Sequence, residues 1–192
     1  LDGFKRVNDT LGHSQGDHLL QMAAVRIADQ LRPTDFVARI GGDEFVILLP
    51  SLGRDEMSAA QVAEEVADRV VRCLTEPFDL TTKVVRVSAS VGIALSGAAI
   101  ADVEAEELLR QADLAMYAAK EVGGFGHCIF DERMDAEAQR AMHLEVQLAK
   151  AIELEDLAIH LQPRLDIATG ALTGAEALLR WNDPTAGPVD TA

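Results

Sequence analysis

Apolar residues recur along the chain at two spacings, one typical of helices and one typical of strands. Between about residues 14 and 31 they fall three or four positions apart, which predicts a helix that Pro33 ends. A second helix is predicted over about residues 55–75, where Pro77 follows, and a third over about residues 103–122. Each predicted helix has one apolar face, so each is expected to pack against another element.

Short runs of β-branched and aromatic residues predict strands between these helices. Residues 36–40 and 45–49 flank two consecutive glycines, and glycine accepts positive φ at both central turn positions, so we expect a β-hairpin. Residues 84–95 predict a longer strand, and residues 128–130 a short closing one. Helices that alternate with mostly hairpin-linked strands predict an α+β fold, in which helices flank a central, mostly antiparallel sheet.

The character of the chain changes after residue 130. Residues 131–155 are highly charged, as expected of a solvated connecting helix. Beyond it, residues 157–161 and 172–181 are predicted strands that flank a turn at Thr169-Gly170. Because residues 156–192 are too few to enclose a core, we expect the incomplete beginning of a second domain there. Both ends of the chain are expected to be cut.

Composition limits the partners of this protein. The formal net charge is −15, with 32 acidic against 17 basic residues, which disfavours nucleic acid and contact with an anionic membrane. A small anion can still bind where a metal ion, a lysine and backbone amides neutralise it locally. The two cysteines match no metal-ligand spacing, and no membrane span or signal peptide is evident. We therefore expect a cytoplasmic protein, or the cytoplasmic part of a larger sensor.

Two carboxylates follow the predicted turn at once. Strand alternation sends Asp43 and Glu44 to opposite faces near the hairpin tip. A glycine turn lets a bulky anion approach the backbone, and carboxylates beside it can seat a divalent metal that carries a nucleotide phosphate. The alternative is an ordinary hairpin whose two acids are solvated, and these residues alone leave both readings open.

The rest of the chain supplies a family resemblance. Residues 41–45, Gly-Gly-Asp-Glu-Phe, match the signature of the GGDEF family, the diguanylate cyclases that make cyclic di-GMP from two GTP molecules. The resemblance covers residues 1 to about 130 and implies the palm-like fold of that family without its first strand. Further blocks resemble the family at matching spacing: Phe4-Lys5-Arg6-Val7-Asn8-Asp9, Gly12-His13, Gly16-Asp17, Ser88 to Ala94, and Ala112 to Lys120.

This resemblance implies a metal site and a catalytic group at the predicted hairpin. In the family, magnesium or manganese binds the third signature residue, here Asp43, and a main-chain carbonyl that corresponds to Leu1. A further acidic ligand would lie just ahead of Leu1, outside this chain. The resemblance assigns deprotonation of the attacking ribose 3′-hydroxyl to Glu44 or Asp43. Lys5 would balance charge on the triphosphate.

Five residues would contact GTP by the same resemblance. Asn8 and Asp17 fit guanine, because an amide can pair with the purine edge and a carboxylate accepts from its N1–H and amine. Lys120 would reach the phosphates, and Phe4 and His13 complete the predicted substrate-binding set. Each type has a plainer alternative: a solvated surface lysine, a turn or N-cap residue, or a packed histidine. The joint spacing favours the binding role for Asn8 and Asp17.

Arg32-Pro33-Thr34-Asp35 resembles the inhibitory product site of the family. Its placement just before the hairpin matches the motif at which cyclic di-GMP docks and halts turnover. A guanidinium suits phosphate or the guanine edge, and a carboxylate suits the guanine amine. The alternative is a helix-ending arginine followed by an aspartate in a loop.

One position departs from the family pattern. After the lysine of the last block relatives carry Gly-Arg-Asn, whereas this chain reads Gly123-Gly124-Phe125. Glycine cannot replace a phosphate-contacting arginine, so Gly124 puts the turnover rate and the phosphate affinity in doubt. The loss of that side chain need not abolish binding of guanine or metal.

A second resemblance lies in the last segment. Gln162-Pro163 and then Glu176 to Trp181 resemble the opening of an EAL domain, the family of cyclic di-GMP phosphodiesterases. In that family the motif glutamate, here Glu176, binds metal at the end of a barrel strand. Because barrel active sites collect residues from several strand ends, residues 156–192 cannot hold that activity alone.

These observations lead to one function and two alternatives. The leading hypothesis is a diguanylate cyclase domain in a GGDEF–EAL signalling protein, which acts as a homodimer because each subunit holds one GTP. The first alternative is a catalytically weak module that binds GTP or cyclic di-GMP and regulates the attached EAL domain. A purely structural domain would not need guanine-type and metal-type residues together.

Overall fold

The computed structural model describes most of the chain, and its described residues form two compact units. The first unit is Leu1–Asp135 and the second is Ala136–Ala192. Each is described by itself below. The described residues are 1–50, 52, 55–81, 83–96, 104–121, 123, 125–183 and 187–189.

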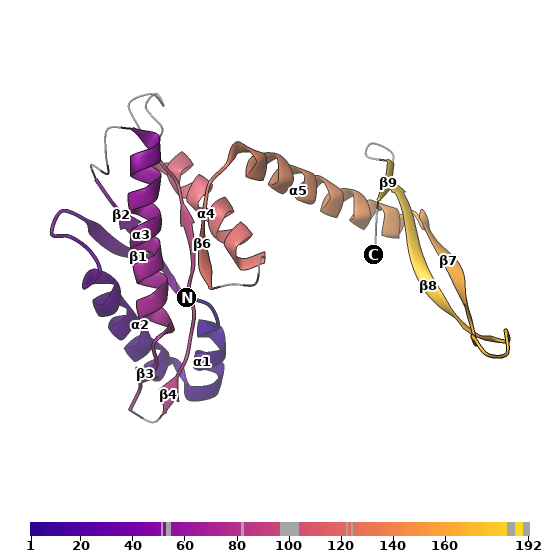
Figure 1. Cartoon of the computed structure of the whole chain (residues 1–192), viewed down its shortest axis with the longest axis horizontal. Helices are drawn as coiled ribbons and strands as arrows, with labels where there is room; N and C mark the ends of the chain where they lie inside the picture. The colour runs from indigo at the N-terminus through magenta and orange to yellow at the C-terminus, as the bar shows by residue number, and fades with distance from the viewer. Residues whose placement is uncertain are drawn as a thin grey trace. The chain divides into compact units, whose positions relative to one another are not determined.

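Five helices lie in the described residues, and four of them were predicted. The predicted helices are confirmed as α2, α3, α4 and α5, while α1 was missed (Figure 1). α1 has only eight residues, and its Asn8-Asp9-Thr10 run has weak helix propensity, so no long periodic pattern announced it. The bounds are α1 Phe4–Leu11, α2 His13–Ala28, α3 Glu56–Thr75, α4 Ala105–Glu121 and α5 Glu132–Glu153.

The strands of the first unit confirm the predicted hairpin and correct two other expectations. β1 and β2 pair antiparallel, with Phe36 opposite Leu48. The predicted strand over residues 84–95 is divided into β4 and β5, and β3 pairs antiparallel with β4. β5 and β6 pair parallel, because α4 crosses over between them. The bounds are β1 Phe36–Gly41, β2 Glu44–Leu48, β3 Phe78–Asp79, β4 Val84–Val85, β5 Ser90–Ile93 and β6 Gly126–Ile129.

Helices cover both faces of the β5–β6 pair. Ile93 of β5 is buried against Ala63 and Ala67 of α3. The neighbouring Gly92 faces the other way, where a Cβ would overlap backbone atoms of Ala112 and Met116 in α4. Since consecutive strand residues point to opposite faces, α3 and α4 sandwich this pair, as Figure 1 also shows. The α+β class of this unit is therefore confirmed. In place of one central, mostly antiparallel sheet, however, its described strands form three two-stranded pairs, two antiparallel and one parallel.

A second group of contacts joins the hairpin to the helices. The main core is formed by α2, α3 and the residues that follow α3, with Leu19 and Phe78 among its fully buried side chains. Val37, Phe45 and Ile47 of the hairpin pack against this core. Full burial of a large apolar side chain stabilises a fold by about 1.5–3 kcal/mol, and these partly buried side chains each contribute a fraction of that, so the core fixes one face of the hairpin.

The second unit contains most of α5 and an antiparallel sheet in the order β7-β8-β9. β7 Leu157–Leu165 and β8 Leu172–Asp183 pair along their length and confirm the two predicted strands and their turn, and β9 is Gly187–Val189. Strands joined by a tight turn pair antiparallel, whereas parallel barrel strands need crossover connections. In the described part of this unit no piece of an EAL barrel is evident, so the expected start of an EAL domain stays a prediction.

Among the described residues, no helix combines the length and the apolar character that a membrane crossing requires.

Candidate functional site

The hairpin tip carries the first group of candidate residues. Gly41 lies in β1 and pairs with Glu44, so the turn itself consists of Gly42 and Asp43. Only Gly42 of the two glycines has positive φ, at 50°. The expectation of positive φ at both glycines is therefore wrong. Positive φ at the first central residue alone is typical of a type II′ turn, and it places Asp43 in the bend.

Two hydrogen bonds hold this bend in place. The Nε of Arg39 donates to the carbonyl oxygen of Gly42 at 2.9 Å. The main-chain nitrogen of Leu1 donates to the carbonyl oxygen of Asp43, also at 2.9 Å, and lies 3.8 Å from the Asp43 carboxylate. The structure thus brings together Leu1 and Asp43, the two residues assigned to the metal site.

Four charged side chains surround the Leu1 nitrogen. The charges of Asp43, Asp2, Lys120 and Glu44 all act on this nitrogen. Lys120 lies in the last turn of α4, and its charge is opposite in sign to that of the three acids. Asp43, Glu44 and Lys120 therefore lie near enough to Leu1 for their charges to act on it, although α4 is distant in sequence from the hairpin.

The oxygen donors at the tip fit a magnesium or manganese ion only in part. The carboxylate of Asp43 and the main-chain carbonyl of Leu1 are donors of the type that these ions prefer. No group of three or more histidine, cysteine or acidic side chains that could hold a metal ion is found among the described residues. Since magnesium takes about six ligands, the arrangement suits an ion that nucleotide phosphates and water also bind.

The candidate guanine-binding residues lie on the first two helices. Asn8 is in α1, and its side-chain oxygen is buried without a hydrogen-bond partner among the described atoms. A Cβ at Gly16 would overlap that oxygen and would lie 3.3 Å from the ring of Phe4. Gly16 therefore leaves the space into which Asn8 and Phe4 fit. An unpaired buried acceptor is costly, and a bound donor would relieve that cost.

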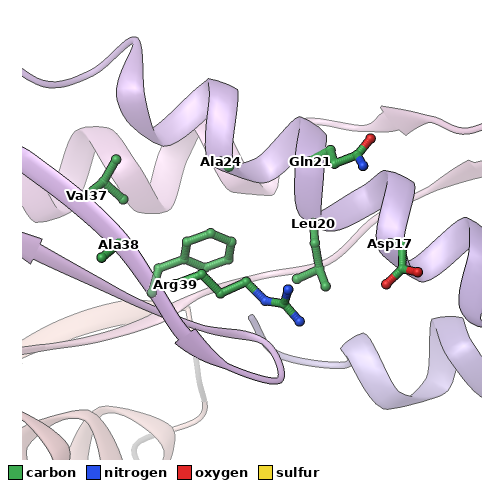
Figure 2. A pocket seen from close by; sticks show the side chains of 8 residues that line it. Asp17, Leu20, Gln21, Ala24, Val37, Ala38 and Arg39 are labelled. Carbon is green, nitrogen blue, oxygen red and sulfur yellow. The ribbon is translucent and has the colours of Figure 1, made fainter.

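Asp17 lines a cavity between α2 and the hairpin. The cavity has a volume of about 340 Å³, and Phe45 of β2 is one of its lining residues. Leu20 of α2 also lines it (Figure 2). This volume falls in the range of small-molecule sites. Asn8 is not among the lining residues, so the structure places Asp17 directly at the cavity, while Asn8 lies behind Gly16.

Sequence reasoning missed Arg39 at this cavity. Figure 2 shows its side chain extending from the hairpin toward the part of α2 that carries Leu20 and Asp17. Arg39 pairs with Phe45 across the hairpin and shares a strand face with Val37. The sequence could have revealed Arg39, because it is a charged residue on the strand face that otherwise points toward the core.

Two other candidates stand apart from these contacts. Lys5 and His13 are exposed, and no hydrogen bond or ion pair joins either side chain to the described residues. Lys5 is the second residue of α1, and His13 is the first of α2. The geometry neither assigns them a partner nor links them to the hairpin tip.

The Arg32–Asp35 segment forms a local turn between α2 and β1. The backbone N–H of Arg32 donates to the Asp35 carboxylate at 2.8 Å, and the Asp35 N–H donates to the Arg32 carbonyl at 2.9 Å. Such a turn is what the plainer loop interpretation requires. The guanidinium of Arg32 is exposed and makes no hydrogen bond within the described residues, so it is available to a ligand.

The remaining candidates lie outside these groups. Glu176 lies in β8, pairs with Gln162 and is exposed. Gly124, the departure from the family pattern, lies outside the described residues.

Comparison with known proteins gives a consistent family. The family described as "Diguanylate cyclase, GGDEF domain" matches residues 1–124. The bifunctional diguanylate cyclase/cyclic di-GMP phosphodiesterase MucR of Pseudomonas aeruginosa is 43% identical over 188 residues, which cover 97% of this chain and 26% of MucR. The cyclic di-GMP phosphodiesterase PdeR of Escherichia coli is 38% identical over 187 residues, which cover 97% of this chain and 27% of PdeR. The chain thus spans about a quarter of these relatives.

Solved structures resemble the first unit. The GGDEF domain of YfiN (TpbB) from Pseudomonas aeruginosa has a TM-score of 0.60 and 36% identity, and the match covers 68% of this chain and 77% of that one. An EAL/GGDEF domain protein from M. capsulatus has a TM-score of 0.59 and 43% identity, with 68% and 80% covered. The GGDEF domain of DgcB from Caulobacter crescentus, solved in complex with c-di-GMP, has a TM-score of 0.57 and 26% identity, with 67% and 72% covered.

Proposed function

Since this chain belongs to the GGDEF family of diguanylate cyclase domains, we propose that its first unit condenses two GTP molecules into cyclic di-GMP and releases pyrophosphate. The observation that carries this proposal is the cavity lined by Asp17 beside the hairpin that presents Asp43 and Glu44. GTP needs two neighbouring sites: the cavity would hold its base, and the hairpin tip would hold its triphosphate.

The chain's own residues divide the work of binding. Asp17 and Asn8 select guanine, since a carboxylate accepts from the guanine N1–H and amine and an amide pairs with the purine edge. Phe4 packs beside Asn8, and His13 completes the substrate contacts. Lys120 neutralises phosphate charge at the tip, where its own charge already acts on Leu1. Lys5 balances the triphosphate from α1.

The hairpin tip carries out the chemistry. Asp43 and the carbonyl of Leu1 would hold the magnesium or manganese ion, which neutralises charge on the phosphates when it is bound. Glu44 or Asp43 accepts the proton of the attacking ribose 3′-hydroxyl. The hydroxyl oxygen bonds to the α-phosphorus of a second GTP, and pyrophosphate leaves. The reciprocal attack by the 3′-hydroxyl of the second GTP closes the ring and releases a second pyrophosphate. Two subunits supply one GTP each, so a symmetric pair brings hydroxyl and phosphorus together.

A second candidate function is regulatory. In it the domain binds GTP or cyclic di-GMP with little turnover and modulates an attached phosphodiesterase. Gly124 favours this candidate, because it lacks the phosphate-contacting side chain of relatives. PdeR, which matches almost the whole chain, is named a phosphodiesterase. Arg32, with its exposed guanidinium, and Asp35 would form the product site at which cyclic di-GMP inhibits.

We also propose that the chain continues into an EAL domain. The domains would be a GGDEF domain over residues 1–130, a connecting helix over 131–155 and the start of the EAL domain over 156–192. The match to the bifunctional MucR along 97% of this chain supports that arrangement. Glu176 would bind metal in the complete EAL domain.

Product formation tests the proposal. The full-length protein with magnesium and GTP should yield cyclic di-GMP, measured by chromatography, and Asp43→Ala should abolish the product. Asp79→Ala, which alters an exposed acid of β3, is the matched control and should retain it. A folded, GTP-binding protein that forms no product supports the regulatory function instead.

A further inference from the structure

Asp2 has contacts that the proposed function does not use. Its carboxylate oxygen Oδ2 accepts hydrogen bonds from the hydroxyls of Ser88 at 3.1 Å and Ser90 at 2.9 Å. Its backbone N–H donates to the carbonyl oxygen of Ser88 at 2.8 Å. Three bonds therefore tie Asp2 to a segment 86 to 88 positions away in sequence.

The serines offer a rigid anchor. Ser88 is 7% exposed and stands between the buried residues Val87 and Ala89. Ser90 begins β5, whose Gly92 lies against the backbone of α4 so closely that no Cβ would fit. A carboxylate bound to such a segment has little freedom to move, because close-packed interiors do not yield easily.

The same two-residue segment reaches the hairpin tip. Leu1 precedes Asp2, and its nitrogen donates to the carbonyl oxygen of Asp43. A continuous path of hydrogen bonds therefore runs from β5 through Asp2 and Leu1 to the turn that carries Asp43. The Asp2 side chain binds the two serines at one end of this path, and the backbone of Leu1 binds Asp43 at the other end.

From this path we infer that Asp2 is a positioning residue: its bonds to Ser88 and Ser90 fix Leu1 and Asp43 at the distance from each other that cation-bound GTP requires. The inference rests on the proposed function. Asp2 acts through the backbone of Leu1 and need not touch the cation. Groups that orient a metal ligand typically change metal affinity by about 10-fold to 100-fold when they are removed.

Two other roles for Asp2 make different predictions. If Asp2 only closed the edge of the sheet, its removal would lower thermal stability and leave the hairpin tip unchanged. If its charge bound the cation directly, the serines would not matter and Asp2→Asn would be as harmful as Asp2→Ala. In the positioning role, Asp2→Asn retains an acceptor oxygen for the serine hydroxyls and preserves most of the function.

Two measurements on the full-length protein test the inference. The first is the affinity for Mn²⁺·GTP, measured by the electron paramagnetic resonance signal of free Mn²⁺. The second is hydrogen exchange of the backbone amides of residues 41–45 without any ligand. The variants are Asp2→Ala, Asp2→Asn, Ser88→Ala with Ser90→Ala, and the combination of Asp2→Ala with both serine changes. Ser96→Ala, an exposed serine of the same unit, is the matched control.

The positioning role predicts a specific pattern. Asp2→Ala and the paired serine variant should each weaken Mn²⁺·GTP binding by about tenfold or more and speed exchange at residues 41–45. Their combination should do no more than either alone, because both remove the same contact. Asp2→Asn and Ser96→Ala should remain close to the unchanged protein.

Additive effects, or serine changes without effect, overturn the inference. If the unchanged protein does not bind Mn²⁺·GTP, the proposed function fails, and the exchange measurement still decides the role of Asp2. Should a variant fail to fold, Ser90→Ala alone removes one of the two hydroxyl bonds and serves in its place.

Discussion

Two hairpins in this chain have similar pairing and different surroundings. One face of β1–β2 packs on the core through Val37, Phe45 and Ile47, and its turn is bonded to Leu1. In β7–β8 the strands pair over a longer stretch, yet Ile159 and Leu161 remain 67% and 68% exposed. Strand pairing is therefore enough to form a hairpin. The β1–β2 hairpin is a candidate site because it also contacts segments that are distant in sequence.

The turns differ in the same way. The β7–β8 turn is held by local bonds, since the Asp166 carboxylate accepts from the N–H groups of Ala168 and Thr169 and from the Thr169 hydroxyl. The Asp43 turn is instead held by a distant segment, since its carbonyl oxygen accepts a hydrogen bond from the main-chain nitrogen of Leu1. Glu176 belongs to no group of three or more histidine, cysteine or acidic side chains that could hold a metal ion in the described part of its unit.

The largest expected effect is a loss of stability when a methyl group is added at one glycine of the first unit. Gly92→Ala in β5 forces a Cβ into the backbone of α4, and such overpacking costs about 1–3 kcal/mol or more. Gly174→Ala in β8 places its Cβ in open space, so we expect little change. Denaturant unfolding of the two variants measures the difference. Equal losses would contradict the close contact between β5 and α4.

A methyl group added at Gly16 should weaken the binding of GTP. Gly16→Ala displaces the side chain of Asn8, so we expect GTP affinity to fall by about tenfold, the effect of losing about one good hydrogen bond. Gly126→Ala adds the same group in open space within the same unit and is the control. Calorimetric titration with GTP and magnesium gives both affinities. Unchanged affinity in Gly16→Ala would remove Asn8 from the site.

The smallest expected effect is a pH dependence of the local turn. Hydrogen bonds from the Thr169 hydroxyl and from backbone amides lower the pKa of Asp166 below its ordinary value of 3.8. The folded state therefore binds fewer protons than the unfolded chain. The stabilisation is complete above about pH 4 and is lost as pH falls through the folded-state pKa.

Hydrogen exchange of Ala168 and Thr169 between pH 5 and pH 2, corrected for intrinsic rates, measures this loss. Asp166→Ala should remove the extra dependence. A turn whose protection does not respond to acid would show that Asp166 does not hold it.

The features that could be predicted from the sequence are those that depend on the local pattern of residues. Long amphipathic helices, both hairpins and the acidic tip follow from periodicity and turn residues. The turn was placed one residue too early, because the letters Gly-Gly do not reveal that Gly41 pairs with Glu44. Helix α1 was too short to show its period.

Other features depend on contacts between distant segments. The bonds of Asp2 to Ser88 and Ser90 and the approach of Lys120 to Leu1 bridge 86 or more positions, and no local pattern records them. The parallel pairing of β5 with β6 likewise follows from the way α4 crosses over. Arg39 could have been identified from the sequence, since it is a charged residue on a strand face that otherwise points toward the core.

Discrimination between GTP and ATP tests the central claim most directly. Calorimetry of the full-length protein with magnesium should show binding of a non-hydrolysable GTP analogue and much weaker binding of the matching ATP analogue. Asp17→Ala should abolish that preference, because it removes the carboxylate at the cavity. Equal binding of the two analogues, or a preference for GTP that survives in Asp17→Ala, would contradict a guanine site beside the hairpin.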